Sequence, residues 1–176
     1  GYNLIQFNNF EFWPTERDKD SGETDVKKKI KYYSWNDNWQ FRCFRSYPGT
    51  NIDVTGGHLP IFPSGIKVRL SPNKFIMRHY AIRSYEQGMR KIFEERLPRY
   101  PEHEKKKWGL NKYTKFKREE QYFIIDSSRL TEYKEDGQWQ VERNFDGHRG
   151  YGFPQLNSSE EVQKEMEKYG KLLKSI

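Results

Sequence analysis

The sequence predicts an α+β fold in which a mixed sheet of short strands is followed by helices. Apolar and aromatic residues alternate with polar residues in short segments before Tyr80, which is the period of half-buried strands. After Ser84 the apolar residues recur at helical spacing instead. Aromatic residues make up 16% of the 176 residues and charged residues 32%, so a few aromatic-rich strands must form the core. This length suits one domain.

The strand predictions rest on alternation and on turn residues between segments. Pro14 ends an early strand because proline has no N–H for pairing, and Tyr47–Thr50 forms a turn. The polar segments Thr15–Lys29 and Asp136–Gly152 are predicted to be loops. The predicted strands are Tyr2–Phe7, Phe10–Trp13, Trp39–Phe44, Ile52–Val54, Ile66–Leu70, Phe75–Tyr80 and Gln121–Ile125.

Two helices are predicted from apolar stripes and capping residues. The first begins at Ser84, which forms a capping box with Gln87, and ends at Pro98 and Pro101. The second covers Ser159–Lys174 and is capped by Ser158 with Glu161. The apolar stripes are Tyr85, Met89, Ile92 and Phe93 in the first helix and Val162, Met166, Tyr169 and Leu173 in the second.

The chain has a formal net charge of +7, with its basic excess in Lys27–Lys31 and Arg78–Lys117. Such a surface attracts phosphates of any kind, including nucleic acid, anionic lipid and the diphosphate of a sugar nucleotide. The single Cys43 excludes an internal disulfide, and its alternating segment predicts a buried structural thiol. No run of about 18 apolar residues occurs, so we expect a cytoplasmic protein that is at most peripheral to a membrane.

A Gly-Gly-His segment is the first candidate for a functional role. Neither Gly56 nor Gly57 has a Cβ, so the backbone there can approach a ligand closely. His58 then lies at the edge of a loop rather than inside a packed element. The alternative interpretation is a turn residue with an exposed ring.

The second candidate lies where the strand Phe75–Tyr80 leads into the first helix. His79 ends this strand, and Arg78 and Arg83 lie on either side of it. The helix N-terminus at Ser84 would add N–H donors, which favour an anion. A satisfied rim histidine is the alternative for His79, and for Arg90 and Lys91 a solvated helix face is the better interpretation.

Several of these segments, in this order, resemble family 2 glycosyltransferases. The segments are FEFWPT (Phe10–Thr15), KYYSW (Lys31–Trp35), QFRCFR (Gln40–Arg45), GGH (Gly56–His58) and NKFIMRHYAIRSYEQGMRKIFEERLPRY (Asn73–Tyr100). The most specific piece is HYxIRSxEQxxRKxFxER, from His79 to Arg96. The resemblance covers about Gly1 to Tyr113 and is to the part of these enzymes that follows the metal-binding Asp-x-Asp region.

The resemblance implies a GT-A-like α/β domain that uses a nucleotide-diphosphate sugar donor, a hydroxyl-bearing glycan, lipid or other acceptor, and Mg²⁺ or Mn²⁺. His79 stands at the position of a metal-binding histidine, and Arg83 would clamp phosphate. Gly56, Gly57 and Arg78 would contact substrate. Residues 1–113 would then be the C-terminal part of the catalytic domain, and residues 114–176 an extension with a terminal helix.

This chain departs from similar sequences at two places. Leu59 follows Gly-Gly-His where an acidic residue is usual, and Trp108-Gly109 replaces Trp-His. An acidic residue there would be the natural base for an acceptor hydroxyl, so His58 becomes the nearest candidate base and Asp53 the second.

A GT-A domain binds its nucleotide on an initial βαβ unit, which would precede Tyr2–Phe7. Asp18-Lys19-Asp20 spells Asp-x-Asp, but it lies in a polar loop with no strand before it, so we interpret it as a chance match. We therefore expect the chain to be a fragment or a natural short form that lacks the nucleotide-binding half and is incomplete as an enzyme.

Two other function classes remain open at this stage. A basic, aromatic-rich module could bind nucleic acid by stacking bases on its rings, although no binding motif occurs and no nucleic acid is expected as a partner. A non-catalytic interaction domain would also account for Leu59.

Overall fold

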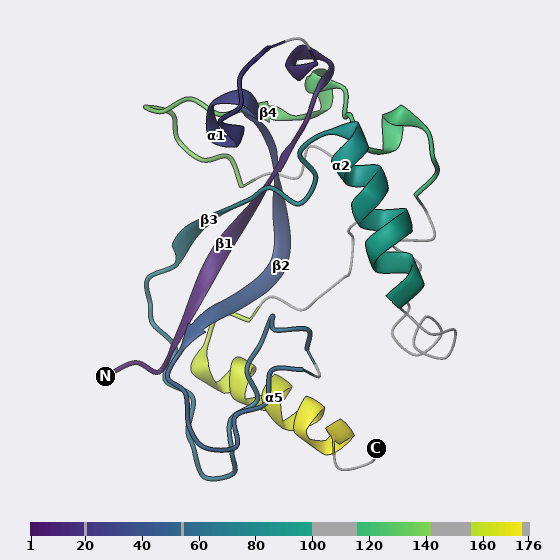
Figure 1. Ribbon diagram of the computed structural model, residues 1–176. Helices are drawn as coiled ribbons and strands as arrows, with labels where there is room; N and C mark the ends of the chain where they lie inside the picture. The colour runs from purple at the N-terminus through teal and green to yellow at the C-terminus, as the bar shows by residue number, and fades with distance from the viewer. Residues whose placement is uncertain (20, 54, 100–115, 142–155, 174–176) are drawn as a thin grey trace. The chain divides into compact units, whose positions relative to one another are not determined.

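The computed structural model describes residues 1–19, 21–53, 55–99, 116–141 and 156–173, without the side chains of 37–39 and 172–173. It confirms the α+β class, with a sheet and separate helices (Figure 1). Within these residues the sheet has four strands in the order β3-β1-β2-β4. Strand β2 pairs with β4 antiparallel, and isolated bridges, one of which joins Leu4 to Leu70, add parallel pairing. The strands are β1 (Leu4–Trp13), β2 (Tyr32–Phe44), β3 (Phe75–His79) and β4 (Thr131–Glu132).

The chain divides into two compact units that are interleaved in the sequence. Unit 1 comprises Gly1–Asn9, Asp37–Met77 and Tyr151–Ile176, and unit 2 comprises Phe10–Asn36 and Arg78–Gly150. The predicted boundary at residue 113 lies outside the described residues and stays a prediction.

Strands β1, β2 and β3 are confirmed, and β2 extends further than predicted. The two predicted segments at the start of the chain form one strand, β1, because Asn9 continues it and is itself buried. Strand β2 begins at Tyr32 rather than at Trp39.

The predicted strands Ile52–Val54 and Ile66–Leu70 are wrong. In the first, Asn51 makes a single bridge to Ile61 and a turn follows, while residue 54 lies outside the described part. In the second, side chains bind the backbone N–H groups that a strand would use. Val68 N donates to Gln163 Oε1 at 3.0 Å and Leu70 N donates to Ser159 Oγ at 2.9 Å. These bonds tie the segment to α5, and its pairing with β1 is limited to the bridge between Leu70 and Leu4.

The predicted strand Gln121–Ile125 is also wrong, because local hydrogen bonds form a 3-10 helix at Glu120–Tyr122. Ile124 N donates to Glu120 O at 2.9 Å, and only Ile125 bridges to another segment, at Thr15. The predicted loop Thr15–Lys29 contains two short helical turns, a 3-10 turn at Glu16–Asp18 and α1 (Val26–Lys29). Residues 136–141 of the other predicted loop contain no helix or strand.

Both predicted helices form with the predicted caps. Helix α2 (Tyr85–Met89) continues as a π-helix (Arg90–Arg96) and a 3-10 turn (Leu97–Arg99). Ser84 Oγ accepts from Gln87 N at 3.1 Å, but Gln87 Oε1 accepts from Arg83 N rather than from Ser84.

Helix α5 (Ser159–Leu173) has a reciprocal capping box, in which Glu161 N donates to Ser158 Oγ and Ser158 N donates to Glu161 Oε2. The helix lies beside the loops that connect β2 and β3 (Figure 1).

The core of unit 1 packs on one face of α5. Val162 and Met166 of this helix are buried as predicted, and Tyr169 is partly buried. The side chain of Leu173 lies outside the described part. The other buried members of this cluster are Leu4, Phe41, Leu59, Ile61, Phe62, Val68 and Leu156.

Unit 2 contains two apolar clusters. In the first, Phe123 and Ile82 press against α2 so closely that a Cβ on Gly88 would clash with the Phe123 ring, which explains a glycine inside this helix. In the second, aromatic rings from strands and a loop pack on one another, with Phe12 stacked on Tyr80 at 4.8 Å between centroids. The buried or partly buried rings of this second cluster are Phe10, Phe12, Tyr33, Trp35, Tyr80, Tyr133 and Trp139.

The predicted burial of Cys43 is wrong, because its side chain is exposed. Strand β2 ends at Phe44, and Phe41 and Phe44 both pack in the core of unit 1, whereas Cys43 is not a member of this cluster.

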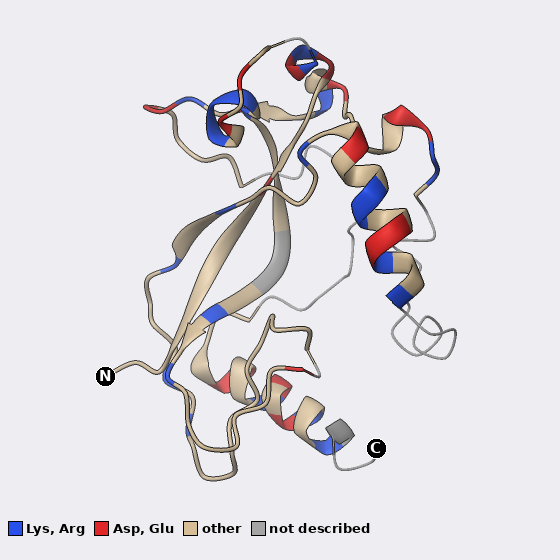
Figure 2. Cartoon of the chain, in the orientation of Figure 1, with Lys and Arg blue, Asp and Glu red and all other residues tan. Residues whose placement is uncertain are grey.

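The charges of the described residues are mixed along the helices (Figure 2). Basic residues dominate α1, with Lys27, Lys28 and Lys29, whereas α2 carries the acidic Glu86, and acidic and basic side chains lie together on the π-helix and α5. Among the helices that the structure describes, none is both long and apolar enough to cross a membrane.

Candidate functional site

A buried carboxylate holds the predicted metal-binding histidine. Glu11 lies on the central strand β1 and His79 at the end of the neighbouring strand β3, and Glu11 Oε1 is 3.1 Å from His79 Nδ1. The Glu11 side chain is only 5% exposed, whereas 44% of the His79 side chain is exposed. An ionised carboxylate can only accept, so Nδ1 carries the proton, and in the neutral ring Nε2 carries the lone pair.

Arg78 is held by aromatic rings beside this pair. Its guanidinium lies 4.1 Å from the centroid of Tyr133 and 5.4 Å from that of Trp139, and it donates a hydrogen bond to the Tyr133 hydroxyl. This arrangement ties the strand end to the loop after β4. Nearby, burial raises the pKa of Tyr80. The predicted contact of Arg78 with substrate stays a prediction.

Arg83 is exposed just before α2, and its backbone N–H donates to Gln87 Oε1 at 3.0 Å. Its predicted role as a phosphate clamp is therefore sterically open and stays a prediction. Arg90 is exposed as predicted and pairs with Glu95 at 3.4 Å. The prediction of a solvated Lys91 is wrong, because this residue is partly buried and its Nζ donates to Ala81 O.

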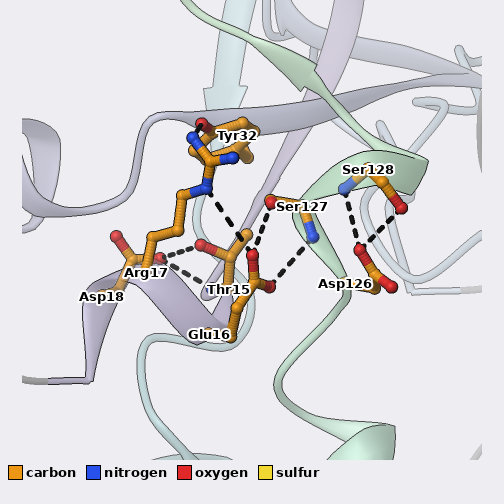
Figure 3. Close-up of polar contacts among 8 residues, drawn as sticks. All are labelled: Thr15, Glu16, Arg17, Asp18, Tyr32, Asp126, Ser127 and Ser128. Carbon is orange, nitrogen blue, oxygen red and sulfur yellow. Dashed lines mark hydrogen bonds and ion pairs between the residues drawn. The ribbon is translucent and has the colours of Figure 1, made fainter.

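A polar cluster in unit 2 explains the chance Asp-x-Asp match (Figure 3). Asp18 is buried, and its Oδ2 accepts from Thr15 N at 2.6 Å and from Thr15 Oγ1 at 2.9 Å. Its carboxylate thus stabilises a local turn. Residue 20 lies outside the described part.

The same cluster contains a carboxylate that joins two distant segments (Figure 3). Glu16 accepts hydrogen bonds from the hydroxyl and the backbone N–H of Ser127, and these bonds, the hydroxyl's first, hold the pKa of Glu16 below its usual value. Arg17 Nη1 donates to the Tyr32 hydroxyl at 2.8 Å. Likewise, hydrogen bonds from Ser128 lower the pKa of Asp126.

The Gly-Gly-His segment forms a tight turn in unit 1. Gly56 and Gly57 have φ values of 59° and 76°, which only glycine adopts readily, so the conformation requires the glycine pair. Gly57 N donates to Ile52 O at 2.8 Å, and Thr55 Oγ1 donates to Leu59 O at 2.5 Å. The backbone carbonyl of His58 accepts from Phe41 N at 2.8 Å, which anchors the turn to β2.

Arg42 lies beside this turn. Its Nε donates to Gln40 Oε1 at 2.7 Å, and Gln40 is 3% exposed. Its Nη2 lies 3.5 Å from His58 Nδ1. A guanidinium can only donate, so Nδ1 of His58 is the acceptor and the proton of the neutral ring is on Nε2. Burial lowers the pKa of Arg42.

Leu59 and Asp53 have opposite environments. Leu59 is fully buried in the core of unit 1, so an acidic side chain in this position would be enclosed among apolar residues. Asp53 is exposed, and its carbonyl accepts from Gly56 N at 3.0 Å. The position of Leu59, where the resemblance implied an acid, is therefore a packing position in this fold.

No family model, curated protein or solved structure matches this chain.

The predicted site residues are divided between the two units. His58, Asp53, Gly56 and Gly57 lie together in unit 1, and Arg78, His79 and Arg83 lie in unit 2. Trp108-Gly109 lies outside the described residues. Sequence reasoning missed Glu11, although a lone acidic residue inside the aromatic segment FEFW is an indication of a buried charge with a partner. It also missed the pairing of Gln40 with Arg42, although residues two positions apart in a strand lie on the same face.

The surroundings of His79 fit one ligand position of a metal site. A carboxylate on the other ring nitrogen is the usual partner that orients a metal-binding histidine. In the part of the chain that the structure describes, no three or more His, Cys, Asp or Glu side chains form a group that could hold a metal ion. His79 would therefore contribute one ligand to a site completed by other groups.

Proposed function

We propose that this chain supplies the acceptor-side and metal-histidine part of a family 2-like glycosyltransferase with a GT-A-like fold. The reaction would transfer a sugar from a nucleotide-diphosphate sugar to an acceptor hydroxyl with the help of Mg²⁺ or Mn²⁺. The observation that supports this best is the pairing of the buried Glu11 with His79, the residue at the family's metal-binding position.

Glu11 would act as a positioning residue for His79. By accepting from Nδ1, it fixes the ring orientation and keeps the lone pair on Nε2, the atom that would face a metal ion. A metal bound there would neutralise charge on the departing diphosphate. Arg83, which is exposed four residues after the end of β3, would bind a phosphate oxygen.

The tautomer of His58 affects whether His58 or Asp53 is the better candidate for the catalytic base. With Nδ1 accepting from Arg42 and the proton on Nε2, the neutral ring of His58 is a hydrogen-bond donor. The exposed carboxylate of Asp53 then becomes the better candidate for deprotonating an acceptor hydroxyl in unit 1.

The competing interpretation, a nucleic-acid module, requires exposed aromatic rings. Phe10, Phe12, Phe41 and Phe123 are each at most 1% exposed, so these rings cannot stack on bases. These four rings therefore support a core role, and the exposed rings among the described residues, Tyr2 and Phe75, are few for a stacking surface.

The proposal is tested in the full-length protein that carries this chain, by measuring sugar transfer from a panel of sugar nucleotides with Mn²⁺. His79→Ala should abolish most metal-dependent transfer. Glu11→Gln keeps an acceptor for Nδ1 but loses the charge, so we expect a loss of about 10- to 100-fold. The Mn²⁺ concentration for half-maximal activity should also rise in Glu11→Gln, an effect that a purely structural role would not produce.

Lys171→Ala, an exposed substitution on α5, is the control and should transfer sugar like the wild type. Unchanged metal-dependent activity in His79→Ala would refute the ligand assignment. Absence of any response to sugar nucleotides, together with salt-dependent binding of generic RNA, would support the nucleic-acid module instead.

A further inference from the structure

The guanidinium of Arg42 is fixed in place next to a glycine turn. A buried amide, Gln40, accepts from its Nε, and Gln40 is itself enclosed on β2. A long side chain loses less conformational entropy on binding when it is already held. The remaining nitrogens of Arg42, Nη1 and Nη2, are therefore held in position to bind a ligand.

The outer edge of this guanidinium, formed by Nη1 and Nη2, borders the turn. A Cβ on Gly57 would lie 3.7 Å from Nη1, which places this nitrogen directly beside the turn. One N–H of Nη2 is directed to His58, which leaves the other N–H of Nη2 and the two of Nη1 as donors for the oxygens of a carboxylate or phosphate.

His58 adds a second donor of defined direction. Because its Nδ1 accepts from Arg42, its neutral ring carries the proton on Nε2. A guanidinium edge and an imidazole N–H on one turn form a donor set that suits an oxyanion. None of the described carboxylates lies within ion-pair distance of Arg42, so its charge has no internal counter-ion in that part of the chain.

We propose that Arg42 and His58 form an oxyanion site that binds a carboxylate or phosphate group of the acceptor. This inference rests on the proposed function, because it identifies the ligand of the site with the acceptor of the sugar. It predicts that the acceptor is anionic, either an acidic sugar or a phosphorylated molecule. The partial desolvation of Arg42, which lowers its pKa, also strengthens its attraction for an anion.

The test is direct binding to the full-length protein, without any transfer reaction. Inorganic phosphate, glucuronate and neutral glucose are titrated, and the ¹⁵N resonances of Arg42 Nε and the His58 ring are followed. We expect at least one of the two anions to bind and glucose not to shift these resonances. Arg42→Ala should weaken binding by about tenfold or more, because a charge-assisted bond is lost. Arg42→Lys should recover part of the affinity but not the bidentate geometry.

Arg45→Ala is the matched control, since Arg45 is an exposed arginine just after β2 that contacts only the Tyr47 ring among the described interactions. Binding of glucuronate alone would support an acidic sugar as the acceptor, and binding of phosphate alone would support a phosphorylated one. Equal affinity in Arg42→Ala and Arg45→Ala, or no anion binding by the wild type, would overturn the proposal. Because no sugar is transferred in this assay, failure of the glycosyltransferase proposal would not affect its result.

Discussion

The two histidines of the candidate site have partners of opposite charge on the same ring nitrogen. In unit 2, Nδ1 of His79 faces the carboxylate of Glu11, whereas in unit 1, Nδ1 of His58 faces the guanidinium of Arg42. A carboxylate places the proton on Nδ1 and the lone pair on Nε2, and a guanidinium does the reverse. The pair shows that the same residue type is prepared as a ligand in one unit and as a donor in the other.

The His58 region of unit 1 and the His79 region of unit 2 also differ in the kind of group that stabilises them. The turn of His58 is fixed by uncharged groups, namely the glycine pair, the Thr55 hydroxyl and the buried side chain of Leu59. Unit 2 uses ionised groups, including the Glu11 pair and the contact of Glu16 with Ser127. We therefore expect the two regions to respond differently to substitution and to pH.

The largest effect is expected in unit 1 from Leu59→Asp, which introduces the acid that the family resemblance calls for. Leu59→Ala should already cost about 2–5 kcal/mol of unfolding free energy, because it leaves a cavity in the core. Leu59→Asp should cost more, because it also buries a carboxylate without a partner. Urea unfolding measures both, with the exposed Asp53→Asn as control within about 0.5 kcal/mol of the wild type. A folded and stable Leu59→Asp protein would show that this position is not a packing position.

A smaller effect is expected in unit 2 from Ser127→Ala, which removes the hydroxyl that binds Glu16. The pKa of Glu16 is lowered in the folded state, so its contribution is present above its unfolded pKa and is lost as the pH falls through its folded pKa. The half-exposed carboxylate is screened by solvent, and we expect a loss of about 0.5–1 kcal/mol at pH 7. Denaturant unfolding at pH 7 and at pH 3 measures it.

The difference between wild type and Ser127→Ala should therefore shrink at pH 3. Ser128→Ala, which removes a hydroxyl bound to Asp126 within one turn, is the matched control that leaves the link between the two segments intact. An equal loss at both pH values would contradict the assignment of the effect to the ionised Glu16.

The smallest expected energy difference is that between the two tautomers of each histidine ring. It is nevertheless the most direct test of the comparison between His58 and His79. Histidine ¹⁵N spectra above pH 8 should show the proton of His79 on Nδ1 and that of His58 on Nε2. Arg42→Leu should remove the donor to His58 and release its preference, while His79 stays unchanged. The same tautomer on both rings of the wild type would remove the basis of the comparison.

Local pattern was enough to predict much of this fold. The alternation of aromatic residues predicted β1, β2 and β3, and the capping residues Ser84 and Ser158 predicted the starts of both helices. These features depend on residues a few positions apart, whose side chains and backbone groups meet within a single element. The sequence also singled out the glycine pair and both histidines as residues of the candidate site.

Only the tertiary structure decided what these residues contact. Glu11 and His79 are 68 positions apart, and Arg42 and His58 are 16 apart, so no local period connects them. The segment Ile66–Leu70 has the alternation of a strand, but distant side chains from α5 satisfy its N–H groups. In the sequence, Leu59 stood where the resemblance implied a catalytic acid, and in the fold it is a core residue. Sequence determined where the elements form because that depends on near neighbours, whereas charge pairing, tautomer and burial depend on segments that meet only on folding.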